Sequence, residues 1–146
     1  MEKILNPTFF IPDIAYERGE IERVSMDVFQ DPNTNDFFLR FLEAARKAPL
    51  VPLSKEMWKK LENTDSYEIA SQDWASVKHH AVDGKPGHPR DWQLYRSRYE
   101  QNARIEAPII LKKGGILHLV SGNTRLMVAR ALGITPQVLL VELPEN

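Results

Sequence analysis

The sequence predicts a single α/β domain over residues 1–146, in which a small mixed sheet built by residues 104–146 is covered by a mainly helical N-terminal part, residues 1–103. Three short apolar runs have the length and composition of buried strands: 108–112, 116–120 and 137–143. Elsewhere, apolar residues recur at the spacing of one helix face. A chain of 146 residues is long enough to bury one core of this kind.

The N-terminal part begins with about thirty residues that we expect to be irregular or extended. Residues 8–14 are aromatic and β-branched but contain Pro12, which suits an edge strand or an extended arm. A turn cluster follows, and apolar spacing then predicts a helix over 36–48 that Pro49 stops. Three residues are candidates for its N-cap: Asn33, Thr34 and Asn35.

Three more helices are predicted: 54–62, 66–80 and 89–102. Ser54 is the N-cap of the first, and Asp65 and Glu68 have the spacing of a capping pair at the second. The Gly- and Pro-rich segment 83–89 is a loop, with Pro89 as the first residue of the third helix.

The C-terminal part reads as strand, strand, helix, strand. Gly114-Gly115 suits a two-residue hairpin turn between the first two strands. The helix is predicted over 123–132, and Gly133 stands where helices commonly end in a left-handed residue. The last strand, 137–143, returns to the sheet. This ββαβ unit forms the core of the predicted fold.

The composition excludes several classes of protein. There is no cysteine, which excludes disulfides, thiolate metal sites and cysteine nucleophiles. Residues 1–7 are broken by polar side chains and Pro7, unlike a signal peptide, and no apolar run reaches membrane-spanning length. We therefore expect a cytoplasmic protein with no membrane partner.

The charges are divided unevenly along the chain. Up to Val77 there are nine Lys and Arg against fourteen Asp and Glu, whereas from Lys78 onward there are ten against six. A basic C-terminal half favours an anionic ligand, either a nucleotide or a nucleic acid. The alternative is that opposite charges face each other within one fold.

One stretch carries the strongest functional signal, because an apolar strand runs through a tight turn directly into a helix. Gly122 permits close backbone approach, the first helical N–H groups have no partner within the helix, and Arg125 projects from the first turn. This arrangement suits a phosphate, held by five residues: Ser121, Gly122, Asn123, Thr124 and Arg125. The alternative is a plain turn, with Ser121 or Asn123 as N-cap and Arg125 on the surface.

The C-terminal part resembles the ParB/sulfiredoxin-like superfamily over residues 107–143. The resemblance is carried by six features: Pro108–Leu111, Gly114-Gly115, Leu117–Val120, Gly122-x-x-Arg125, Ala129–Gly133 and Val138–Val141. It implies a small α/β domain whose Gly-x-x-Arg turn holds nucleotide phosphates. Activities in that superfamily include CTP hydrolysis on DNA, ATP-dependent sulfinic acid reduction, phosphorylation of free serine, and a claimed nuclease activity.

The turn departs from both of the family's best-known patterns. ParB proteins have a glutamate, and sulfiredoxins a cysteine, at the position of Asn123. The substitution excludes sulfinic acid reduction and argues against a ParB-like CTP cycle, and no helix-turn-helix follows. Only Gly122 and Arg125, supported by Gly133, match the family's pattern at individual positions.

The resemblance therefore predicts a nucleotide-binding protein that transfers or hydrolyses a phosphoryl group, a phosphotransferase or NTPase using Mg²⁺ with ATP or another NTP. In this prediction Arg125 stabilises charge that develops on the phosphates. A carboxylate must hold Mg²⁺ or orient the attacking group, and Glu106, just before the first core strand, is the leading candidate. Weaker candidates are Glu100, Asp27 and Asp31. Each has the alternative role of an ordinary surface carboxylate.

Two other functions remain open. Four arginines near the aromatic residues of 89–102 suit a DNA-binding accessory or nuclease-like protein: Arg90, Arg96, Arg98 and Arg104. The third possibility is a catalytically silent interaction module, favoured by Asn123. His79, His80 and His88 match no metal-ligand spacing, so no metal site is predicted from them, and His118 is expected to face solvent rather than line the pocket.

Overall fold

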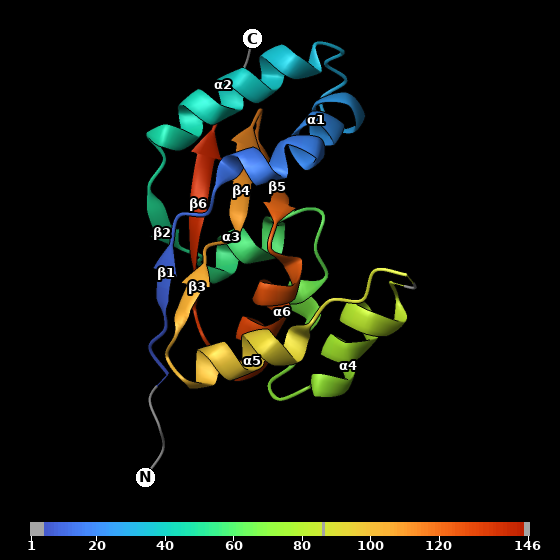
Figure 1. Ribbon diagram of the computed structural model, residues 1–146, viewed down its shortest axis with the longest axis vertical. Coiled ribbons are helices and arrows are strands. Elements are labelled where there is room, and N and C mark those ends of the chain that lie inside the picture. The colour runs from blue at the N-terminus through green and yellow to red at the C-terminus, as the bar shows by residue number, and fades with distance from the viewer. Residues whose placement is uncertain (1–4, 86, 145–146) are drawn as a thin grey trace.

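The computed structural model describes residues 5–85 and 87–144 as a mixed α/β fold with two sheets (Figure 1). In chain order its elements are β1 (Thr8–Phe10), the 3₁₀ helix η1 (Ile14–Glu17), α1 (Arg18–Asp27), α2 (Thr34–Arg46), β2 (Leu50–Pro52), α3 (Lys55–Lys60), the 3₁₀ helix η2 (Ser66–Glu68), α4 (Trp74–Lys78), the π-helix η3 (His79–Asp83), α5 (Trp92–Glu100), β3 (Arg104–Glu106), β4 (Ile109–Lys113), β5 (Ile116–Ser121), α6 (Asn123–Leu132) and β6 (Gln137–Glu142). The main sheet has the strand order β2-β6-β4-β5, and β1 pairs with β3 in a second, two-stranded parallel sheet.

The predicted small mixed sheet is confirmed, and β4, β5 and β6 lie close to their expected positions. It is not built by residues 104–146 alone, because β2 from the N-terminal part forms one of its edges and β3 pairs with β1 in the second sheet. β4 pairs antiparallel with β5 and parallel with β6, so the chain crosses over through α6 between β5 and β6. Gly114 and Gly115 both have positive φ, as a two-residue hairpin turn of this kind requires. Gly133 ends α6 with φ of +73°.

Two apolar clusters lie on opposite faces of the main sheet. Successive strand residues alternate between them, because side chains along a strand point to opposite faces: Ile110 belongs to one cluster, and Ile109 and Leu111 to the other. One cluster joins the sheet to α1 and α2, and the other joins it to α6, α5, α3 and α4. Figure 1 shows α1 and α2 together at one end of the view and α4, α5 and α6 toward the other.

The N-terminal segment is more helical than predicted. The expectation of irregular structure over the first thirty residues is correct for β1 and its flanks and wrong for η1 and α1. Asp13 caps η1 by accepting a hydrogen bond from the Ala15 N–H at 3.0 Å. Within α1 only Ile21 and Val24 are buried apolar side chains, so the helical periodicity is too sparse to detect in the sequence.

The helix predicted over 66–80 is broken in the structure. Only residues 66–68 form a 3₁₀ turn, and Asp65 makes no side-chain capping bond there. The chain then bends at Gln72, which has φ of +61° and donates its backbone N–H to the Ala131 carbonyl of α6 at 2.8 Å. Asp73 caps the new helix α4 through the Ser76 N–H at 3.1 Å. The predicted helix is therefore interrupted where the chain forms a tertiary hydrogen bond with α6.

Caps also decide the other helix boundaries. Asn33 is the N-cap of α2 and Ser54 of α3, both as predicted. α5 begins at Trp92 rather than at Pro89, because the Asp91 carboxylate accepts the Leu94 N–H at 3.0 Å and fixes the start. Two strands were not predicted, β2 and β3, each three residues long. No helix in the described part of the chain is long and apolar enough to cross a membrane.

Candidate functional site

A cavity of about 370 Å³ opens at the N-terminus of α6. All five residues of the predicted phosphate turn, 121–125, line it together with the preceding end of β5. Its other walls come from distant parts of the chain: the end of η1 and the start of α1, residue 63, the segment between η3 and α5, and Tyr95 of α5. The fold thus assembles the cavity around the turn that the sequence singles out.

Gly122, not Ser121 or Asn123, is the N-cap of α6. It has φ of +112°, and no side chain in the described residues caps the helix. The Gly122 carbonyl accepts the first helical hydrogen bond, from the Leu126 N–H at 3.0 Å. The first-turn N–H groups of α6 therefore begin beside the cavity without a side-chain partner, and they carry the positive end of the helix dipole.

Gly122 is also required by packing inside the protein. A Cβ atom at this position would lie 2.6 Å from the Pro108 Cβ and 2.9 Å from the Pro108 Cα. The neighbour that excludes a side chain at Gly122 is thus Pro108, whereas the close approach expected from the sequence was to a bound anion. The glycine is therefore explained by the fold and is not by itself a mark of ligand binding.

The Asn123 side chain belongs to a hydrogen-bonded chain that connects the turn with the 58–66 segment. Its Oδ1 accepts from the Thr64 hydroxyl, and Thr64 Oγ1 lies 2.8 Å from Ser66 Oγ. Ser66 is fully buried and accepts from the Trp58 Nε1–H at 2.7 Å. This chain anchors the first residue of α6 to the 58–66 segment and holds the turn in place.

Arg125 is 8% exposed, so the alternative of a surface arginine is wrong. Its Nη1 donates to the Glu106 carbonyl at 2.7 Å, and its Nη2 donates to Ser121 Oγ at 3.1 Å. These bonds use two of the five guanidinium N–H donors. The Tyr95 ring centroid lies 6.0 Å from the guanidinium carbon. Arg125 is therefore held rigidly at the cavity wall and has a structural role as well.

Two further cations and two carboxylates line the cavity. Lys85 and Arg90 come from the segment before α5, and Glu17 and Glu20 come from the end of η1 and the first turn of α1. Glu20 also pairs with Arg23 on the same helix. From the sequence, Arg90 was expected on a nucleic-acid surface, and no local pattern pointed to Lys85 or the two glutamates. Glu17 and Glu20 lie about one hundred residues before the turn in the sequence, so only the fold brings them to it.

The predicted catalytic carboxylates do not line the cavity. The Glu106 side chain is 53% exposed, with its Oε2 4.0 Å from Arg125 Nη1, and it is the backbone carbonyl that holds the arginine. Asp27 pairs with Arg23 at 3.5 Å, and Glu100 with Arg96 at 3.1 Å. The role given to Glu106 is therefore not supported by its position.

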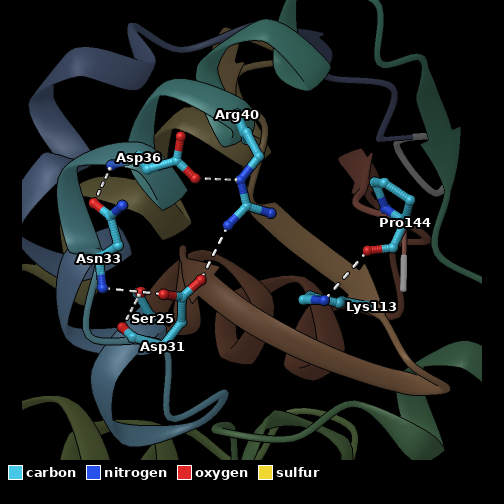
Figure 2. A network of polar contacts seen from close by, with 7 residues as sticks. All are labelled: Ser25, Asp31, Asn33, Asp36, Arg40, Lys113 and Pro144. Carbon is cyan, nitrogen blue, oxygen red and sulfur yellow. Dashed lines mark hydrogen bonds and ion pairs between the residues drawn. The ribbon is translucent and has the colours of Figure 1, made fainter. Parts of the chain in front are cut away.

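Asp31 lies in the corner between α1 and α2, away from the cavity (Figure 2). Its carboxylate accepts from Arg40 Nη2 at 3.0 Å and from the Asn33 N–H at 3.0 Å. The Asp31 carbonyl accepts from the Ser25 hydroxyl at 2.8 Å. These contacts give Asp31 a structural role: it fastens α1 to α2.

The four arginines of the predicted nucleic-acid surface are dispersed. Arg90 lines the cavity, and Arg104 lies over the Phe10 ring at 4.6 Å. Arg96 pairs with Glu100 and lies 4.0 Å from the centroid of the Trp74 ring, which also stacks on Trp92. Only Arg96 and Arg98 belong to α5. A single basic face with free aromatic rings is therefore not formed by this set.

His118 is buried, which contradicts the expectation that it faces solvent. It is 6% exposed, and neither ring nitrogen has a hydrogen-bond partner among the residues that the structure describes. Burial lowers the pKa of His118, the charge of Arg23 lowers it further, and Glu62 and Glu20 act in the opposite direction. In the described residues no cluster of three or more His, Asp or Glu is placed to hold a metal ion.

Comparisons of this chain with protein-family models, with curated proteins and with solved structures find no match. The resemblance over 107–143 thus stays an expectation from the sequence, and the function has to be argued from the cavity itself.

Proposed function

We propose that the protein binds a nucleotide in the cavity at the N-terminus of α6 and transfers or hydrolyses one of its phosphoryl groups. The observation that carries the proposal is the meeting of three cations, Lys85, Arg90 and Arg125, with the uncapped first turn of α6 around one cavity of about 370 Å³. This volume lies in the range of small-molecule sites.

The cavity offers phosphate two kinds of donor. The first-turn N–H groups of α6 suit an anion because they lack intrahelical partners and lie at the positive end of the dipole. Lys85, Arg90 and Arg125, which line the same cavity, can add charge-assisted hydrogen bonds. Ser121 and Thr124 add hydroxyl groups to the same wall. Together they support binding of a ligand with several phosphate oxygens.

The residues present fit Mg²⁺ as part of such a ligand. Mg²⁺ in phosphoryl-transfer sites is held by one or two carboxylates together with substrate phosphates, and Glu17 and Glu20 line the cavity that would take the phosphates. When bound, the ion would neutralise charge on the phosphate oxygens. Within this scheme Glu17 and Glu20 replace Glu106 as the carboxylates, and Arg125 stabilises charge developing on the phosphoryl group.

The test replaces Lys85 and Arg90 rather than Arg125, because replacing Arg125 would also remove its two structural hydrogen bonds. Binding of the four NTPs is measured with and without Mg²⁺ by calorimetry and by thermal shift, since binding to the folded state raises the melting temperature. We expect Lys85→Gln and Arg90→Gln each to weaken nucleotide binding roughly tenfold. Lys59→Gln on α3, which does not line the cavity, is the matched control.

Two results would reject the proposal: no binding of any NTP to the folded protein, or equal weakening by Lys59→Gln and the two cavity variants. A dependence on Mg²⁺ that Glu17→Gln and Glu20→Gln both abolish would support the metal assignment.

A nucleotide-binding module without turnover is the second candidate. It is favoured by Asn123, whose amide oxygen is bound to Thr64 and which stands where the resembled family has its glutamate. Release of inorganic phosphate from the bound NTP distinguishes the two. Phosphate release that is lost in Arg90→Gln supports the enzyme, whereas tight binding without release supports the module.

A further inference from the structure

We propose that the Asn123 side-chain amide donates directly to the phosphate group held at the turn, so that this group is bound without a metal ion between it and the protein. The inference rests on the proposed function, because it assigns a further binding residue of the same cavity. It is carried by a chain of hydrogen bonds that fixes which atom of the Asn123 amide is left for a ligand.

The chain of hydrogen bonds runs from a buried indole to the first residue of α6. Trp58 Nε1 lies 2.7 Å from Ser66 Oγ, and Ser66 Oγ lies 2.8 Å from Thr64 Oγ1. Thr64 Oγ1 accepts from the Ser66 N–H at 3.1 Å and contacts Asn123 Oδ1. Each hydroxyl has a single proton, so the direction of one bond determines the direction of the next.

Only one direction gives the Ser66 hydroxyl proton an acceptor. An indole N–H can only donate, so Ser66 Oγ accepts from Trp58. Among the residues that the structure describes, the other partner of Ser66 Oγ is Thr64, so the Ser66 proton points to Thr64 and the Thr64 proton to Asn123 Oδ1. The opposite direction would leave a fully buried hydroxyl proton without an acceptor, which is unfavourable.

The amide nitrogen of Asn123 is therefore the atom left for a ligand. With Oδ1 bound to Thr64, two N–H donors remain on Nδ2, and they make no hydrogen bond within the described part of the chain. Asn123 lines the cavity. Thr124 lines it as well, and its hydroxyl has no partner among the same residues although Thr124 is only 8% exposed. Two unpaired side-chain donors thus accompany the first-turn N–H groups of α6.

A donor at this position binds phosphate differently from an acidic side chain. A carboxylate and a phosphate repel each other unless a cation lies between them, whereas an amide N–H donates to a phosphate oxygen directly. The carboxylates proposed for Mg²⁺, Glu17 and Glu20, belong to η1 and α1 and not to the turn. We therefore expect the turn to bind a phosphate group after Mg²⁺ has been removed.

The experiment measures binding of inorganic tripolyphosphate by calorimetry, once in EDTA and once in Mg²⁺. We expect wild type to bind in EDTA and Asn123→Asp to weaken this binding roughly tenfold or more, because negative charge replaces two donors. Asn123→Asp still accepts from Thr64 and puts a negative charge at the first residue of α6, so its melting temperature without ligand should equal or exceed that of wild type. A structural role alone would not lower the affinity while the stability is kept.

Asn35→Asp is the matched control. It makes the same change in the first turn of α2, outside the cavity, and should keep the wild-type affinity.

The orientation of the amide is tested at Thr64, which is a positioning residue in this scheme. Thr64→Val removes the hydroxyl that holds Asn123 Oδ1, and we expect tripolyphosphate binding in EDTA to weaken roughly fivefold. Thr64→Ser keeps the hydroxyl and should retain the wild-type affinity.

The outcomes separate this inference from the proposed function. Tripolyphosphate binding that requires Mg²⁺ in wild type, or unchanged affinity in Asn123→Asp, overturns the direct contact and leaves the phosphate site standing. A lower melting temperature together with lower affinity in Asn123→Asp also overturns it, since Asn123 would then have a structural role. Equal affinities of Thr64→Val and Thr64→Ser overturn the role of Thr64. Failure of tripolyphosphate and all four NTPs to bind folded wild type, with or without Mg²⁺, rejects the proposed function itself.

Discussion

Among single residues of the turn, Gly122 is the position where an added side chain should cost the most stability. Gly122→Ala forces a Cβ to within 2.6 Å of Pro108 and gives alanine a φ of +112°. We expect a loss of about 3 kcal/mol in the free energy of unfolding, from steric overlap and the left-handed backbone together. Chemical denaturation measures this directly. Gly115→Ala is the control, since its φ is +80° with no atom within 4 Å, and it should lose only about 1 kcal/mol.

If the two glycine variants lose equal free energies of unfolding, Pro108 shifts easily to make room for a methyl group, and the packing explanation of Gly122 is wrong. Neither variant needs a ligand for this comparison, so the result also separates the structural role of Gly122 from its place in the cavity.

His118 predicts a specific dependence of stability on pH. Its pKa is lowered in the folded protein, so the unfolded chain takes up the proton first as the pH falls. Stability is therefore lost from about pH 6.5, the ordinary histidine value, down to the folded pKa, with a slope of at most about 1.4 kcal/mol per pH unit. Urea unfolding at several pH values from 7.5 downward measures this.

His118→Leu should reduce the loss of stability over this pH range. It should also retain or raise stability at pH 7.5, because it removes two buried nitrogens without partners. The exposed His88→Gln serves as the control and should keep the wild-type slope. An unchanged slope in His118→Leu would show that the acid sensitivity belongs to other groups.

The turn at 121–125 could be located from the sequence because its signal is local. Gly122 and Arg125 stand three positions apart at a strand-to-helix junction, and both line the cavity. Glu106 and His118 were misjudged because their roles depend on neighbours from other elements. The first lends its backbone carbonyl rather than its carboxylate, and the second lies on the sheet face that α1 covers.

At the element scale, the corner between α1 and α2 depends on Asp31. Asp31→Asn keeps the shape but removes the charge that accepts from Arg40 and the Asn33 N–H. Hydrogen bonds to a charged, partly buried group contribute more than surface pairs, so we expect a loss of about 1.5 kcal/mol. The melting temperature should fall by roughly 4 °C.

Asp27→Asn is the comparison for this corner, because Asp27 is 62% exposed and pairs with Arg23 at 3.5 Å on the same helix. Exposed pairs of that kind contribute about 0.5 kcal/mol or less. If the two variants lose equal stability, the network in Figure 2 does not fasten the helices.

Elements with strong local signals were predicted and elements held by tertiary contacts were not. The hairpin, α6 and β6 combine apolar periodicity with glycine turns between them, and their predicted bounds agree with the structure to within about two residues. α1 has only two buried apolar side chains, and the break at Gln72 follows a hydrogen bond to Ala131, far along the chain. Such a bond leaves no trace in the local sequence.

At the scale of the whole molecule, the site combines segments that sequence patterns cannot bring together. The turn at 121–125 was predicted, but Glu17, Glu20, Asn63 and Lys85 reach it only through the fold. Two acidic side chains from the N-terminal half and three basic ones from the C-terminal half line the same cavity.

Ligand binding should therefore stabilise the molecule as a whole. A nucleotide held at one hundred times its dissociation constant would add about 2.7 kcal/mol to the free energy of unfolding. Thermal melts with Mg²⁺–ATP should show this stabilisation in wild type and Lys59→Gln but not in the double variant Lys85→Gln, Arg90→Gln. Stabilisation that survives the double variant would place the nucleotide elsewhere.

Because the two apolar clusters lie on opposite faces of the sheet, local unfolding of one layer would remove only one wall of the cavity. The wall with Glu17 and Glu20 belongs to the layer of α1 and α2, whereas Arg125 and Tyr95 belong to the layer of α5 and α6. Local opening of the first layer would strip away the acidic wall and leave the basic one intact. Native-state hydrogen exchange should then record separate opening energies for α1 and α6. Under the proposed function, the partially opened protein would still bind phosphate but would no longer bind Mg²⁺.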